Sequence, residues 1–140
     1  MKDRYNLQRF LDAQEPVYAQ VCAELAAAKK KSHWMWFIFP QMRGLGRSHA
    51  AEWFGMSSLE EVKAYSTHPV LGAHMRECCR LLLATASNDA SAVFGFPDDL
   101  KLRSSMTLFS RAVPEEAVFR QILEKFFNGA EDAVTLDLIS

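Results

Sequence analysis

The residues best suited to ligand chemistry gather in the segment 41–48, QMRGLGRS. Gly44 and Gly46 form a Gly-x-Gly turn, which lets backbone amides approach a ligand closely. Arg43 and Arg47 carry guanidinium groups that can bind a phosphate or a carboxylate through two parallel hydrogen bonds. The pattern predicts an anion-binding turn, and its candidate ligand-binding residues are Gln41, Arg43, Gly44, Gly46, Arg47 and Ser48.

A second interpretation of this segment stays open. Ser48 is suited to cap a following helix, and the helix N-terminus would then attract an anion. In an ordinary surface loop the glycines would only supply positive φ angles, Ser48 would only cap the helix, and the arginines would be solvated. The spacing matches neither a Walker loop nor a dinucleotide-binding fingerprint.

A histidine and two tryptophans precede the turn. His33 can act as a general acid or base near neutral pH, although a histidine that simply packs beside a tryptophan explains it as well. Trp34 and Trp36 lie about 200° apart on a helix, so at least one of them belongs to the core. The other is a candidate for stacking on a nucleobase, and both are kept as candidate ligand-binding residues.

A second polar group lies in the segment 98–109. Asp98, Lys101 and Ser105 are spaced three and four apart, which places them on one face of a helix, with Ser104 one step around it. A desolvated Lys101 could serve Ser105 as a base, whereas the ordinary alternative is an ion pair between Lys101 and Asp98 with the serines bonded to backbone. The candidate catalytic residues are therefore His33, Asp98 and Lys101, and the two serines are candidate ligand contacts.

The histidines and cysteines predict no metal site. The chain has four histidines and three cysteines, and only His74 and Cys78 are spaced as a possible pair of ligands, without partners. An odd number of cysteines does not fit a disulfide framework, and it favours a reducing cytosol. No cofactor is predicted.

Composition excludes several classes of protein. The 16 basic and 17 acidic residues give a net charge of -1, so no nucleic-acid partner is predicted. The chain begins without the apolar core of a signal peptide and has no run of about 20 apolar residues, so we expect a complete cytoplasmic protein with no membrane partner. Surplus aromatic surface would suit a pocket or a dimer interface equally, so the sequence favours no oligomeric state.

Helical periodicity covers most of the chain and positions these residues. We expect one compact all-α domain over residues 1–140, with several helices and short connections. A capping box at Ser58 and Glu61, prolines in first turns and the stop at Gly129 mark the boundaries. The expected helices cover 7–13, 16–29, 34–39, 58–65, 70–86, 97–112 and 114–128.

Four groups of motifs span almost the whole chain: NLQRFLDAQ at 6–14, KSHWMWF at 31–37 with FPQ at 39–41 and GLGRS at 44–48, HPVLG at 68–72, and DDLKLRSSMTLF at 98–109. Together they resemble family 1810 of the domains of unknown function. The resemblance implies a compact, mostly helical fold and no established activity. Some members carry the label calpastatin, which does not fit, because calpastatins are extended and disordered whereas this composition predicts a packed core.

A looser similarity concerns the ligand. An early aromatic segment, a long helix, and a late Phe-Gly followed by a lysine-containing helix occur in an order similar to that of the glycosidases that act on N-linked ADP-ribose. This similarity suggests a class of ligand and assigns no residue a role. We therefore expect a pocket for an anion or a nucleotide derivative, for example an ADP-ribose-linked molecule. The alternative is a ligand- or protein-binding module without catalysis. The enzyme hypothesis requires His33, Arg47 and Lys101 to share one pocket.

Overall fold

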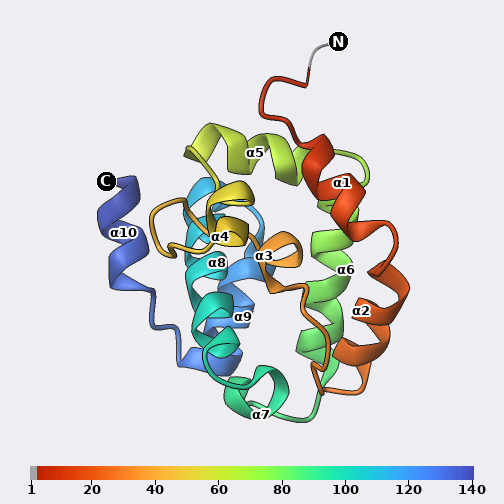
Figure 1. Ribbon diagram of the computed structural model, residues 1–140. Coiled ribbons are helices and arrows are strands. Elements are labelled where there is room, and N and C mark those ends of the chain that lie inside the picture. The colour runs from red at the N-terminus through yellow and green to blue at the C-terminus, as the bar shows by residue number, and fades with distance from the viewer. Residues whose placement is uncertain (1–2) are drawn as a thin grey trace.

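Residues 3–140 are described by a computed structural model, in which helices pack around a central pair, α8 and α9 (Figure 1). Within these residues the order is α1 (Gln8–Gln14), α2 (Tyr18–Ala26), α3 (Met35–Ile38), α4 (His49–Trp53), α5 (Leu59–Thr67), α6 (Leu71–Ala84), α7 (Ala90–Phe94), α8 (Asp98–Ala112), α9 (Ala117–Phe127) and α10 (Ala133–Ile139). Helices α5 and α6 pack against this pair, α2 covers α6, and α10 lies on the outer side of α8.

The predicted all-α fold is confirmed. Every expected helix is present with its ends moved by a few residues, and segment 34–39 contains the short helix α3. Three helices lie outside the expected ranges, and for α4 the sequence indicated only the capping residue Ser48. Helices α7 and α10, of five and seven residues, were not expected. Each begins after an aspartate that caps it: Asp89 accepts from the amide of Ser91, and Asp132 from the amide of Thr135.

The capping box before α5 is formed only in part. The Ser58 hydroxyl accepts a bond of 3.2 Å from the Glu61 amide, as predicted. The Glu61 carboxylate, however, accepts from the amide of Ser57 at 2.9 Å rather than from that of Ser58. Its other oxygen binds Arg9 Nη2 at 2.8 Å, and this buried ion pair holds the carboxylate away from the expected position.

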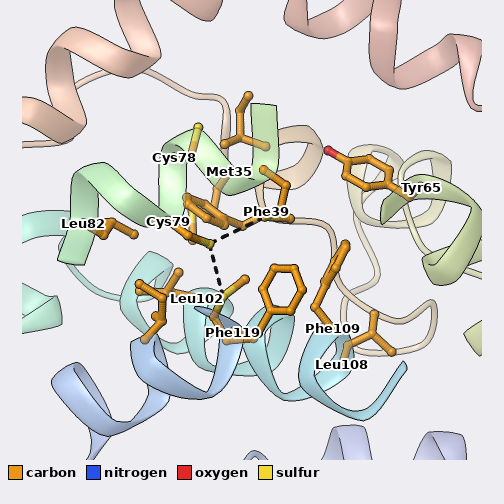
Figure 2. Packing of buried hydrophobic residues seen from close by; sticks show 14 of the residues in the cluster. Met35, Phe39, Tyr65, Cys78, Cys79, Leu82, Leu102, Leu108, Phe109 and Phe119 are labelled. Atoms are coloured by element: carbon orange, nitrogen blue, oxygen red, sulfur yellow. Dashed lines mark hydrogen bonds between the residues drawn. The ribbon is translucent and has the colours of Figure 1, made fainter. Parts of the chain in front are cut away.

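The hydrophobic core joins α5, α6, α8 and α9 (Figure 2). Tyr65 and Phe109 meet edge to face, with their ring centroids 5.5 Å apart. The thiol of Cys79 points between the sulfur atoms of Met75 and Met106, at 4.0 Å and 3.9 Å. Burial raises the pKa of the Cys79 thiol, so this thiol stays protonated and unreactive.

No helix in the part of the chain described here has both the length and the apolar surface needed to cross a lipid bilayer.

Candidate functional site

The loop 41–48 is fixed at both ends. Its first part is tied to the segment after α4 by two backbone hydrogen bonds of 2.9 Å, from the Arg43 amide to the Met56 carbonyl and from the Met56 amide to the Gln41 carbonyl. Its last residue, Ser48, caps α4 by accepting from the amide of Ala51 at 3.1 Å, as predicted. The loop is therefore held in one position beside α4, and Figure 1 shows it reaching towards α10.

The two glycines of the loop have different roles. Gly44 has φ +107°, a backbone conformation that side chains with a Cβ rarely adopt. Gly46 lacks space, since a Cβ at this position would lie 2.8 Å from the Cβ of Ala51. The turn thus needs glycine at both positions for reasons of backbone shape and packing.

A cavity of about 460 Å³ opens between this loop, the start of α8 and the start of α10. Part of its wall is apolar and part carries charged or polar groups. The lining residues are Trp36, Gln41, Leu45, Gly46, Arg47, Ser48, Ala51, Pro97, Leu100, Lys101, Ser104, Asp132 and Val134.

Two cations face this cavity. The ammonium of Lys101 lies 4.5 Å from the centre of the Trp36 ring and 3.3 Å from one oxygen of Asp98. The second oxygen of Asp98 lies 2.7 Å from the ammonium of Lys30, whose side chain is only 5% exposed. Arg47 is exposed and forms no ion pair with any of the described residues. Its guanidinium is free to bind an anion.

The polar groups on the α8 and α10 side are partly engaged. Asp132 uses one carboxylate oxygen to cap α10, accepting from the amide of Thr135 at 2.9 Å and from its hydroxyl at 2.6 Å. The Ser104 hydroxyl donates to the carbonyl of Leu100 at 3.1 Å. Each residue keeps oxygen lone pairs that can accept a hydrogen bond from a ligand hydroxyl.

The segment before α3 is organised by one buried carboxylate, Glu24. It accepts from the amides of Lys31 and Ser32 at 2.8 Å and 3.1 Å, and from the Trp34 indole at 2.9 Å. Burial alone raises the pKa of Glu24, but the bonds from Ser32, Lys31 and Trp34 outweigh it and lower the pKa to about 2. An ionised Glu24 therefore fixes the backbone that carries Lys30 to Asp98.

The cavity brings together a large part of the residues singled out from the sequence. The candidate catalytic residue Lys101 lines it. Asp98 does not line it but forms an ion pair with Lys101. The candidate ligand-binding residues that line it are Trp36, Gln41, Gly46, Arg47, Ser48 and Ser104.

The two tryptophans separate as their spacing predicts. Trp34 is 1% exposed and belongs to the core, whereas Trp36 lies at the cavity. Trp34 is therefore covered on all sides and offers no surface for stacking a ligand.

Four other candidates lie away from this cavity. His33 is exposed outside it, and Gly44 does not line it, since a Cβ at Gly44 would face Leu138. Arg43 borders a different hollow of about 310 Å³ beside α4 and donates to the carbonyl of Gly55 at 3.1 Å. Ser105 is fully buried, and its hydroxyl has no partner among the described residues, so the expected polar face of α8 ends at Ser104.

Sequence reasoning missed the contributions of Lys30 and of α10. Asp132 followed three residues later by Thr135 is a usable signal for the start of a helix. It would have placed Asp132 at the N-terminus of α10. Lys30 gave no such signal, because its partner Asp98 is 68 positions away in the sequence and only the fold joins them.

Comparison with known proteins assigns the family. The family described as "Protein of unknown function (DUF1810)" matches residues 4–139, and the chain belongs to it. The crystal structure of the conserved hypothetical protein Rv1873 from Mycobacterium tuberculosis is similar, with 48% sequence identity, a TM-score of 0.96, and coverage of 98% of each chain. A search of the curated proteins gives no match.

Proposed function

We propose that the cavity lined by Trp36, Arg47 and Lys101 binds a small ligand that combines an anionic group with a planar ring, such as a nucleotide derivative or an ADP-ribose-linked molecule. The observation that carries the proposal is the placement of the Lys101 ammonium 4.5 Å from the centre of the Trp36 ring, on the same cavity as the exposed guanidinium of Arg47. An aromatic surface beside two cations suits a ring that carries a phosphate.

Each part of such a ligand has a matching wall. Arg47 and Lys101 bind the phosphate of the ligand, and the apolar surface of Leu100 and Val134 covers the planar ring of the ligand. The free oxygen of Asp132 accepts a hydrogen bond from a ribose hydroxyl. The volume of about 460 Å³ falls in the range usual for small-molecule sites.

Binding is better supported than catalysis. The carboxylate of Asp98 has both oxygens paired with lysine ammonium groups, at 2.7 Å and 3.3 Å, so it serves to position Lys101. His33 does not line the cavity, which removes the general acid or base of the enzyme hypothesis from this place. The proposed activity is therefore recognition of the ligand.

A second candidate function rests on the rim of the cavity. Phe96 is 77% exposed, and Leu100, Val134 and Leu138 are also exposed, although all four are large apolar residues. Exposed apolar surface of this kind is typical of protein-binding sites. In that function, the protein is a binding module, and an acidic side chain of the partner enters the cavity towards Arg47.

The test compares two arginines of the same loop. Thermal shift and isothermal titration calorimetry would measure binding of ADP-ribose, AMP and adenosine, and chromatography of the incubated ligands would measure turnover. We expect ADP-ribose and AMP to raise the melting temperature more than adenosine does. Arg47→Gln and Lys101→Gln should each weaken binding about tenfold, the usual effect of losing a hydrogen bond to a charged group.

Arg43→Gln is the matched control, because Arg43 carries the same charge four residues earlier but borders a different hollow. It should leave the affinity unchanged. An equal loss in Arg43→Gln and Arg47→Gln, or no shift with any of the ligands, would overturn the proposal. Binding of an acidic peptide that is lost in Phe96→Ser would instead support the binding module.

A further inference from the structure

A second cavity, of about 560 Å³, lies between α1, α2 and the start of α6. These helices form the edge of the molecule opposite α10, so this cavity is separate from the one beside loop 41–48 (Figure 1). Its wall contains Leu11, Glu15, Tyr18, Val70 and His74.

The hydrogen bonds of Gln14 fix the tautomer of His74. Gln14 is 1% exposed, and its amide nitrogen donates to the carbonyl of Phe37 at 2.8 Å and to the hydroxyl of Tyr65 at 2.9 Å. A carbonyl can only accept, so the nitrogen of the amide must face Phe37 and its oxygen must face His74. This oxygen lies 2.7 Å from Nδ1 of His74, and Nδ1 therefore donates.

The other ring nitrogen is left as an acceptor. In a neutral imidazole with a proton on Nδ1, Nε2 carries a lone pair. Burial lowers the pKa of His74, which keeps the ring neutral near pH 7. Between residues 3 and 140 no group forms a hydrogen bond with Nε2 of His74. His74 itself borders the cavity.

The ring of His74 is also held in place. It stacks on the ring of Tyr18 with the centroids 3.6 Å apart and the planes 14° apart. The Tyr18 hydroxyl donates to Glu77 at 2.5 Å. An acceptor whose ring is fixed by both Gln14 and Tyr18 loses little freedom when a ligand binds to it.

The charge and the apolar surface of the cavity define the ligand. Glu15 is the charged residue of the wall, and no lysine or arginine from residues 3–140 lines it. Leu11 and Val70 supply apolar surface. A ligand that fits must donate a hydrogen bond, carry positive charge and present an apolar body.

We propose that this cavity is a second binding site, for a small protonated amine attached to an apolar or aromatic group. The amine donates a hydrogen bond to Nε2 of His74, its charge faces the carboxylate of Glu15, and its apolar body packs on Leu11 and Val70. The site is independent of the function proposed for the cavity beside loop 41–48.

The test uses the full chain labelled with 15N at its histidines. The probe is phenethylamine. Long-range 1H–15N spectra report which nitrogen of each histidine carries the proton, and the signal of His74 is assigned by its absence in His74→Phe. We expect His74 to carry its proton on Nδ1, and phenethylamine to shift the Nε2 signal. Its neutral and acidic counterparts, 2-phenylethanol and phenylacetate, should bind about tenfold more weakly or not at all.

The matched variants are Glu15→Gln and Glu60→Gln, which remove the same charge from two exposed positions. Glu15→Gln should weaken phenethylamine binding about tenfold, and Glu60→Gln should leave it unchanged. If His74→Phe fails to fold, the affinity of Glu15→Gln for phenethylamine still tests the proposal. A proton on Nε2, equal binding of the amine and the alcohol, or no binding of phenethylamine overturns the proposal.

Discussion

Glu24 is a buried carboxylate that should tie the stability of the protein to pH. Its side chain is enclosed by the amides of Lys31 and Ser32 and by the indole of Trp34. These bonds lower the pKa of Glu24 from its ordinary value of 4.5 to about 2, against the opposing effect of burial. The perturbation that tests this is Glu24→Gln, which keeps the shape of the side chain and removes its charge.

The magnitude follows from the pKa. One pKa unit corresponds to about 1.4 kcal/mol, so a fall from 4.5 to about 2 corresponds to about 3 kcal/mol of folding stability. Because the pKa is lower in the folded protein, this stabilisation is present above pH 4.5 and is lost as the pH falls towards 2. About 2 kcal/mol of it should be gone by pH 3.

The assay is urea unfolding followed by circular dichroism at pH 7, 5 and 3. At pH 7 we expect Glu24→Gln to lower the free energy of unfolding by about 3 kcal/mol, and this difference from the unmodified chain should shrink at pH 3. Glu60→Gln is the control, since Glu60 is exposed and should show no such change. A difference between Glu24→Gln and the unmodified chain that is the same at all three pH values would refute the reasoning.

Two further substitutions test packing and buried charge by urea unfolding. Gly46→Ala should cost about 1–3 kcal/mol because the added Cβ would lie 2.8 Å from that of Ala51; an unchanged free energy of unfolding would contradict the tight contact. Arg9→Leu should cost about 3–5 kcal/mol because it leaves Glu61 buried without a counter-charge, and replacing both residues by leucine should recover part of the loss. A double variant that is less stable than Arg9→Leu would contradict the second expectation.

The sequence predicted those helices whose apolar residues repeat over several turns. Helices α6, α8 and α9 show such repeats, and a proline lies at or shortly before the start of each. Helices α7 and α10 hold five and seven residues, and the sequence did not predict them. Since α10 supplies one wall of the cavity, Asp132 could not be placed at the site from the sequence.

The loop 41–48 shows where prediction of the site reaches its limit. The sequence identified Arg43 and Arg47 as equivalent anion-binding residues. Between them the backbone turns at Gly44 with φ +107°, and the two side chains then border different hollows beside α4. The direction of the turn depends on hydrogen bonds between the loop and Met56, which no local pattern reveals.

The positive charge of the cavity depends on a residue that does not line it. Lys101 alone would be neutralised by Asp98, its neighbour one turn earlier on α8. Lys30 lies 2.7 Å from the other oxygen of Asp98, and two lysines with one aspartate leave a net positive charge beside Trp36. Lys30 is carried there by the backbone that Glu24 fixes, so Glu24→Gln should weaken anion binding as well as folding. Loss of stability with an unchanged affinity would show that Lys101 keeps its place without this network.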